Sequence, residues 1–166
     1  MRYEKAWFGE GGKKGIWIAV RGMSTQFGGR RVMAECGYKA LKIYQMAFQL
    51  AVEVHKLSLL LPKYEMFEEG SQMRRSSKSV AAQIVEGYCL RRNKKEYLLY
   101  LNRGYAEAHE TLVHLEFIMA TGSIADMPRC KELWDEYGVL CAMIFRFIKG
   151  ISRMTFGSPF ANEDED

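Results

Sequence analysis

The segment NKKEYLLYLNRGYAEAHETLVHLEFIMATG, residues 93–122, gives the clearest indication of the fold because it contains the start, one face and the end of a long helix. Asn93, followed three residues later by Glu96, is typical of a helix N-terminus, where the asparagine caps free backbone N–H groups. Gly122 ends the pattern, since glycine is favoured just beyond the last helical turn. The apolar residues between them recur at alternating spacings of three and four: Leu98, Leu101, Tyr105, Ala108, Leu112, Leu115 and Met119. This spacing places them on one face of an α-helix.

Three more helices are predicted on either side of this segment. Over residues 40–61, apolar residues follow the helical period until Pro62 interrupts it. The next helix opens near Glu68 and has a face of small residues, so its neighbours can approach closely. Asp126, with Pro128 in the first turn, begins the last helix. The three stripes are Ile43, Met46, Leu50, Val54, Leu57 and Leu61; Met73, Ser77, Val80, Ile84 and Gly87; and Cys130, Leu133, Tyr137, Leu140, Ile144, Phe147, Ile151 and Met154. Four long helices with short connections predict an all-α, up-down-up-down antiparallel four-helix bundle.

A single domain is expected, because 166 residues with 48% hydrophobic content can bury a core without disulfides or metals. We assign the bundle to residues 38–156. Residues 1–37 are rich in glycine and basic side chains and show no helical period, so a flexible tail is expected, with a short strand at residues 15–20 as the alternative. Residues 157–166 form an acidic C-terminal tail that ends in EDED.

The cysteines and the apolar runs predict a cytoplasmic protein without a membrane segment. The cysteines show no metal-ligand spacing and follow no secretory signal, so we expect free thiols in a reducing compartment: Cys36, Cys89, Cys130 and Cys141. The apolar run Ile16–Val20 is far too short to cross a bilayer.

No enzymatic or metal-binding pattern is found. His109 and His114 resemble the zinc-protease motif HExxH, but a spacing of five residues rotates them by about 140° around a helix. No Glu-x-x-His pair for a di-iron site occurs, and no glycine loop follows a strand and opens a helix. The sequence therefore predicts no catalytic residues, no metal, no cofactor and no small-molecule substrate.

The positive charge is local. The whole chain has a net charge of +4, whereas Gln72–Lys95 alone has +6. Four of these cations, here called the basic turn, are Arg91, Arg92, Lys94 and Lys95. They lie at a helix N-terminus, where the macrodipole disfavours each cation by about 0.3–1 kcal/mol, so the fold itself gives no reason for them. Binding to RNA or DNA phosphates would explain why these cations are present. Arg74 and Lys78 are further candidate contacts. A solvated turn that aids solubility is the alternative.

Arg75 is predicted to be structural. In an antiparallel hairpin centred near Arg91, the numbers of facing residues add up to about 182. This places Arg75 opposite Glu107, with Glu110 one turn further on, so that an ion pair can form. The same reasoning for the first hairpin sets Lys78 near Glu53.

Several helices carry a second apolar stripe, which one bundle core does not need. We expect these stripes to mediate self-association; wide helices that bury more of themselves are the alternative. The interface candidates are the phenylalanines of three stripes: Phe48, Phe117 and Phe145.

The pattern QMRRSSKSV at residues 72–80, followed by IVEG at residues 84–87, resembles the four-helix-bundle proteins encoded in intervening sequences of 23S ribosomal RNA genes. Serines and a glutamine replace the alanines and the asparagine common in that family, at Ser76, Ser77 and Gln83. Further agreement lies in Tyr38, Leu41, Ala47, Leu50, Glu65 and the Leu61–Pro62 break. The resemblance implies ring-shaped pentamers. It also extends to the accessory variability determinants of diversity-generating retroelements, which bind nucleic acid.

Taken together, these patterns predict a non-enzymatic, homo-oligomeric bundle that binds RNA or DNA phosphates largely without sequence specificity. A structural assembly or protein-interaction module without nucleic-acid binding is the alternative.

Overall fold

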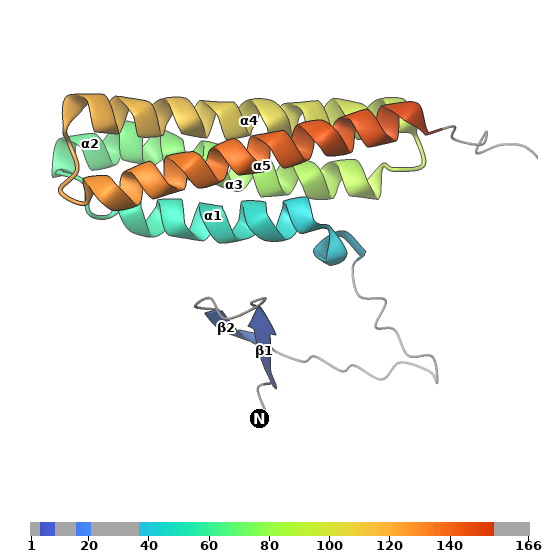
Figure 1. The fold of residues 1–166 in the computed structure, drawn as a ribbon, viewed down its shortest axis with the longest axis horizontal. Coiled ribbons are helices and arrows are strands. Elements are labelled where there is room, and N and C mark those ends of the chain that lie inside the picture. The colour runs from blue at the N-terminus through green and yellow to red at the C-terminus, as the bar shows by residue number, and fades with distance from the viewer. Residues whose placement is uncertain (1–3, 9–15, 21–36, 155–166) are drawn as a thin grey trace, which may run out of the picture. The chain divides into compact units, whose positions relative to one another are not determined.

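The computed structural model describes residues 4–8, 16–20 and 37–154 (Figure 1). The chain divides into two units, residues 1–35 and residues 36–166, which are described separately. The elements in chain order are β1 (Glu4–Phe8), β2 (Ile16–Val20), the short 3-10 helix η1 (Gly37–Ala40), α1 (Lys42–Ser58), α2 (Lys63–Phe67), α3 (Glu69–Cys89), α4 (Lys94–Thr121) and α5 (Met127–Arg153).

In the first unit, β1 and β2 pair as antiparallel strands, with Trp7 opposite Trp17. β2 coincides with the strand that the sequence left as an alternative at residues 15–20. The flexibility of residues 1–37 stays a prediction, and the acidic tail at residues 157–166 lies outside the described residues.

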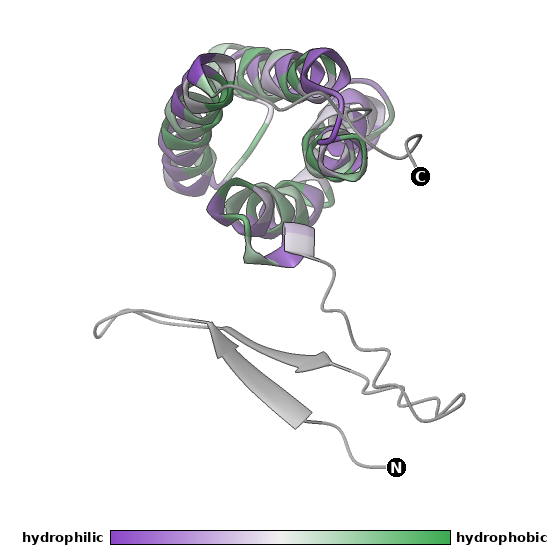
Figure 2. Ribbon diagram, turned by 90° about the vertical axis from the view of Figure 1, so that its right-hand side faces the viewer, coloured by the Kyte–Doolittle hydropathy of each residue, from purple (hydrophilic) through white to green (hydrophobic). Residues whose placement is uncertain are grey.

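In the second unit, the four long helices form the predicted up-down-up-down bundle. α3 packs between α1 and α4, and α5 closes the arrangement by packing against both α4 and α1. Figure 2 looks nearly along the helix axes and shows α1, α3, α4 and α5 around one centre. The antiparallel order brings the start of α1, the turn between α3 and α4, and the end of α5 to the same end of the bundle.

The core lies between the four helices and is closest-packed between α3 and α4. Ser76 and Thr111 meet inside it, with their hydroxyl oxygens 2.8 Å apart. A Cβ on Gly87 would lie 3.1 Å from the Cβ of Tyr100, so a larger residue has little room there. The predicted close approach along the small-residue face of α3 is therefore confirmed. The largest fully buried side chains include Met73, Ile84, Leu101, Leu115, Leu133 and Tyr137.

The predicted helix boundaries around α4 and α5 are confirmed. The Asn93 side chain accepts hydrogen bonds from the backbone N–H groups of Lys95 (3.1 Å) and Glu96 (3.3 Å). Gly122 has a φ of 63°, a left-handed conformation that glycine adopts without steric cost. The Asp126 carboxylate accepts from the backbone N–H of Arg129 at 3.1 Å.

The predicted end of the first helix is wrong. α1 stops at Ser58 rather than at residue 61, and Pro62 begins the additional short helix α2. The apolar pattern continued past the helix because Leu61 is buried without being helical. Periodic burial therefore does not by itself define the end of a helix.

Candidate nucleic-acid interface

The basic turn lies at the end of the bundle where α3 leads into α4. We call residues 37–52, 79–105 and 142–154 the basic half, and residues 53–78 and 106–141 the acidic half. The basic half has ten basic and two acidic side chains, which give it a net charge of +8. The acidic half has seven basic and eleven acidic side chains, which give it a net charge of −4. The basic side chains of the basic half are Lys39, Lys42, Arg91, Arg92, Lys94, Lys95, Arg103, Arg146, Lys149 and Arg153.

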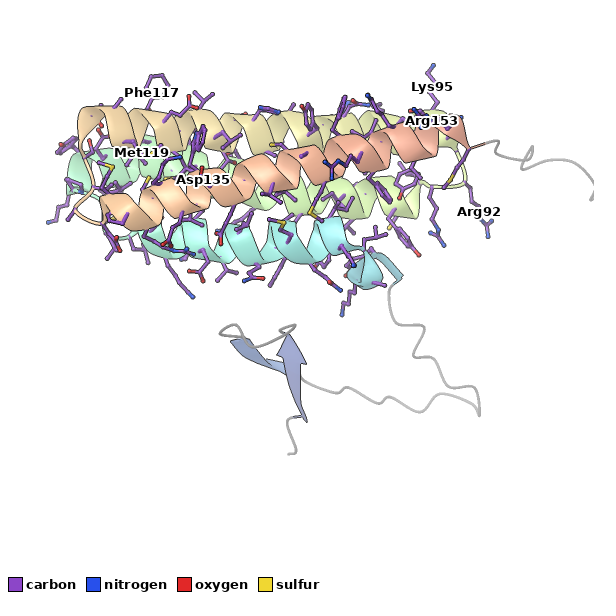
Figure 3. The ribbon with its side chains drawn as sticks, in the orientation of Figure 1. Arg92, Lys95, Phe117, Met119, Asp135 and Arg153 are labelled. Carbon is purple, nitrogen blue, oxygen red and sulfur yellow. The ribbon has the colours of Figure 1, made fainter. Side chains whose placement is uncertain are left out.

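Several of these cations are exposed and unpaired within the described residues, and three of them, Arg92, Lys95 and Arg153, lie at helix ends. Among the described residues, no ion pair or side-chain hydrogen bond involves the charged groups of Arg92, Lys95 or Arg153. Figure 3 shows all three side chains at the same end of the bundle, extending from the α3–α4 turn, α4 and the end of α5. Their charges are therefore accessible to an external anion.

Arg91 is held by its neighbour Tyr88. One guanidinium nitrogen donates to the Tyr88 carbonyl oxygen at 2.9 Å, and the guanidinium lies 4.2 Å from the centre of the Tyr88 ring. The Tyr88 ring also contacts Tyr38 edge-on, at 6.4 Å between centroids. Arg91 is exposed but fixed in orientation, and it covers the ring that could otherwise stack on a base.

Lys94 has a structural role that the sequence analysis did not predict. Its ammonium group donates to the carbonyl oxygens of Ser152 (2.8 Å) and Met154 (2.7 Å) at the end of α5. A cation is favourable at a helix C-terminus, where carbonyl groups lack helical partners. The prediction that the fold has no use for this cation was wrong because it considered α4 alone and not the helix end beside it.

Arg74 is also structural and does not belong to the proposed interface. It lies in the acidic half, where its guanidinium donates to the Ser58 hydroxyl (3.0 Å) and to the Met66 carbonyl oxygen (3.1 Å). These bonds tie α3 to the α1–α2 connection. Lys78, the other candidate on α3, is exposed and lies near the middle of the helix, away from the basic turn.

The predicted ion pair of Arg75 does not form. Arg75 is exposed, and within residues 37–154 no ion pair joins it to Glu107 or Glu110. One carboxylate oxygen of Glu107 is buried without a hydrogen bond, and Glu110 lies 3.8 Å from a ring nitrogen of His114.

The register explains this error. Ser76 faces Thr111, so facing residue numbers add up to 187 rather than about 182, a shift of more than one helical turn. The packing of small residues sets the register, and the midpoint of the turn does not. Likewise, Glu53 pairs with Lys56 at 2.7 Å and Arg129 at 3.3 Å instead of Lys78.

The candidate interface phenylalanines lie on the outside of three helices. Phe48, Phe117 and Phe145 belong to α1, α4 and α5 and are 47%, 54% and 44% exposed. In Figure 3 the Phe117 side chain points away from the bundle. Their exposure leaves them available for contacts between subunits, and self-association itself stays a prediction.

Within residues 4–8, 16–20 and 37–154, no three His, Cys, Asp or Glu side chains are grouped so that they could hold a metal ion. None of the helices described there combines the length and the hydropathy that a membrane span requires. His109 packs against the Tyr105 ring, whereas His114 bonds to Glu69 at 2.7 Å, so the two histidines do not share a site. Burial raises the pKa of Cys130 and Cys141 to about 11, which keeps both thiols protonated at neutral pH.

Sequence reasoning missed Arg153, which extends the exposed cations across two helix ends. Its distance from the basic turn along the chain hides the relation. The predicted topology could have revealed it, because α5 must end beside the α3–α4 turn in an up-down-up-down bundle.

These features define the class as an antiparallel four-helix bundle with its cations concentrated at one end. A family model described as 23S rRNA-intervening sequence protein matches residues 39–146, and the chain belongs to this family. The bundle is also similar to the crystal structure of a protein of unknown function from the S23 ribosomal protein family of Bacteroides thetaiotaomicron. The TM-score is 0.59 at 22% identity, with 64% of this chain and 95% of that chain covered. This likeness supports the fold alone. No curated protein matches the chain.

Proposed function

We propose that the protein is a non-enzymatic, oligomeric bundle that binds the phosphates of RNA or DNA with its basic half. The observation that carries this proposal is the exposure of Arg92, Lys95 and Arg153 at one end, with no anionic partner in residues 37–154. Grouping unpaired cations costs electrostatic energy in the isolated bundle. A polyanion offsets this cost and releases its own counterions on binding.

Little sequence preference is expected at this surface. Specific RNA recognition needs aromatic rings that stack on bases or polar groups that reach base edges. Tyr97 is buried in the core, and the Tyr88 ring is covered by Arg91. Arg92, Lys95 and Arg153 remain as charged contacts for the backbone, which is the same for every sequence.

Self-association strengthens such weak contacts. In a cyclic oligomer, each subunit presents its own basic half, and the contacts to one nucleic acid add up through effective concentration. The exposed Phe48, Phe117 and Phe145 support an oligomer, and the number of five subunits follows from the family resemblance. A cytoplasmic location is part of this proposal, because the described cysteines are free thiols: Cys89, Cys130 and Cys141.

A protein-interaction module is the second candidate, and a separate observation favours it. Around the α1–α2 turn, in the acidic half, four large apolar side chains are exposed by 53–76%: Leu59, Leu60, Tyr64 and Phe67. An exposed apolar patch with a polar rim is typical of a protein contact. This function predicts binding that does not depend on the cations of the other end.

The test is the salt dependence of RNA binding, measured by fluorescence anisotropy with a labelled single-stranded RNA of mixed sequence. Replacing Arg92, Lys95 and Arg153 with Gln is expected to lower affinity at 50 mM salt by about tenfold or more. The slope of log affinity against log salt should become shallower by about 2, because each of the three lost phosphate contacts contributes about 0.7 to it.

The matched control replaces Lys56, Lys63 and Lys131 with Gln. It removes the same charge from exposed positions in the acidic half and should change affinity and slope little. Equal losses of RNA affinity in the two variants would mean that only the net charge of the protein matters. This outcome would contradict a site at the basic half. No binding by the intact protein at 50 mM salt would favour the protein-interaction module.

The oligomer is tested by light scattering at micromolar concentration, where the mass should be several times 19.2 kDa. Replacing Phe48, Phe117 and Phe145 with Ser should lower the mass. A monomeric parent protein would contradict self-association and remove the additive effect of repeated sites.

A further inference from the structure

The end of α5 is held at the basic half of the bundle. Lys94 holds the carbonyl oxygens of Ser152 and Met154, so the chain leaves the bundle directly beside the basic turn. Met154, the last described residue, therefore lies at the end of the bundle that carries the exposed cations Arg92, Lys95 and Arg153. This position follows from the topology, because α5, the last helix of the described residues, ends where α4 begins.

The segment that follows is complementary in charge. Residues 155–166 read TFGSPFANEDED, with no basic side chain and four consecutive acids, Glu163 to Asp166. The basic half has a net charge of +8, and only Glu86 and Glu96 oppose its cations. Apart from these two glutamates, which pair with none of Arg92, Lys95 and Arg153 in the described residues, the run of acids is the anionic group that the chain tethers to this end of the bundle.

From these observations, we propose that the acidic segment Glu163–Asp166 docks on Arg92, Lys95 and Arg153 of its own bundle and competes there with nucleic acid. The docking stands on charge and position alone. The competition rests on the proposed function, because it requires the basic half to bind phosphates.

The length of the segment suits this docking. Glu163 follows Arg153 by ten residues, which span at most about 33–36 Å when extended and about 16–19 Å as a flexible coil. With helix axes 8–10 Å apart, the end of a four-helix bundle is on the order of 20 Å across. The far end of α5 lies about 40 Å away, since 27 residues rise by about 1.5 Å each. As a flexible coil, even the last acid, Asp166, lies only about 18–22 Å from Arg153, so the acids stay within reach of the basic turn and far from the opposite end.

The tether makes weak ion pairs effective. A short flexible linker gives an effective concentration in the millimolar range, so contacts that would be negligible between separate molecules become populated. The carboxylates then occupy the cations that a phosphate backbone would contact. Because both competitors are anions, added salt weakens both interactions.

Docking is tested directly in the full chain with a zero-length carbodiimide, which couples a carboxylate to an amine in contact with it. At 50 mM salt, Glu163–Asp166 should couple to Lys95, and the product should vanish at about 1 M salt. Lys56 and Lys63 in the acidic half are internal controls and should not couple to the segment.

A mixture of isotope-labelled and unlabelled chains shows whether the coupled residues belong to one chain. Coupling within one chain is expected. No product at Lys95, equal coupling to Lys56 or Lys63, or coupling mainly between chains would overturn the proposal.

The competition is tested with the variant Glu163→Gln, Asp164→Asn and Glu165→Gln. Its affinity for the single-stranded RNA probe should rise about three- to tenfold at 50 mM salt, and the difference should disappear by about 300 mM. The matched control is Glu68→Gln, Glu132→Gln and Asp135→Asn, which removes three exposed acids from the acidic half and should raise affinity less than twofold.

The two experiments separate the possible failures. Coupling to Lys95 without RNA binding by any variant would leave docking in place and contradict the nucleic-acid function. Salt-sensitive RNA binding at the basic half, with no coupling and no gain from the neutralised segment, would leave that function in place and overturn the docking.

Discussion

The two halves of the bundle are made from the same helices but use their cations in different ways. In the acidic half, Arg74 bonds to Ser58 and Met66, and Arg129 lies within 4 Å of carboxylates from both α1 and α5. In the basic half, Arg92 and Lys95 meet no anion within residues 37–154. The role of an arginine or lysine therefore depends on which helix ends surround it.

The largest expected difference between the two halves is in the reactivity of their cysteine thiols. Cys89 is exposed in the basic half, whereas Cys130 is buried at the start of α5 in the acidic half. Burial, followed by the nearby Asp126 charge, raises the pKa of Cys130 to about 11, so only about one thiol in a thousand is ionised at pH 8. In a variant with Cys36→Ser, iodoacetamide should modify Cys89 at least about 100-fold faster than Cys130, as followed by mass spectrometry. Similar rates in the folded protein would show that α5 opens readily; similar rates in urea are expected.

The next comparison is between two adjacent arginines of α3 and concerns their contributions to stability. Arg74→Ala leaves the Ser58 hydroxyl and the Met66 carbonyl without their charged donor, and we expect the free energy of unfolding to fall by about 2–3 kcal/mol. Arg75→Ala removes an exposed side chain that has no ion pair within residues 37–154, and should change the free energy of unfolding by less than about 0.5 kcal/mol. Urea denaturation followed by circular dichroism measures both. Equal losses would mean that Arg75 has a partner in solution.

A second adjacent pair makes the same comparison in the basic half. Lys94→Ala removes two hydrogen bonds to the end of α5 and should lower the free energy of unfolding by about 1 kcal/mol. Lys95→Ala should leave it unchanged or raise it by about 0.3 kcal/mol, since a cation near the start of α4 opposes the helix dipole. RNA affinity should respond more to Lys95→Ala. A destabilising Lys95→Ala would contradict the separation of roles within the basic turn.

The smallest effect concerns acid sensitivity in the acidic half. The hydrogen bond from Lys56, with a further one from Arg129, lowers the pKa of Glu53 in the folded protein. A lowered folded pKa stabilises the protein above the ordinary pKa of glutamate, and this contribution is lost as the pH falls through the lowered value. Glu53→Gln should therefore reduce the loss of stability between pH 7 and pH 3 by less than about 1 kcal/mol. Adding Lys56→Gln to that variant should have no further effect on the pH dependence.

Local signals in the sequence predicted the fold well. Asn93, Gly122 and Asp126 act on backbone groups within four residues of themselves, so the sequence alone predicts their roles. The register between α3 and α4 could not be predicted in this way, because it depends on how Ser76 and Thr111 pack across the two helices. An error of about five residues in that register was enough to assign Arg75 the wrong partner.

The candidate site was predicted only in part for the same reason. Arg92 and Lys95 were identified by their position at a turn, and the structure places both on the surface. Lys94 has the same neighbours in sequence, yet its partners lie 58 and 60 residues away. Side chains whose role depends on distant backbone carbonyls, such as Lys94 and Arg74, cannot be separated from free cations by composition or spacing.

The separation of charge along the bundle gives residues 37–154 a permanent electric moment. The dipoles of four antiparallel helices largely cancel in pairs, so this moment comes from side chains and not from the backbone. A body with such a moment rotates in the field of a large anion before the two surfaces touch. Orientation thus precedes contact, and fewer encounters are lost to collisions with the sides of the bundle.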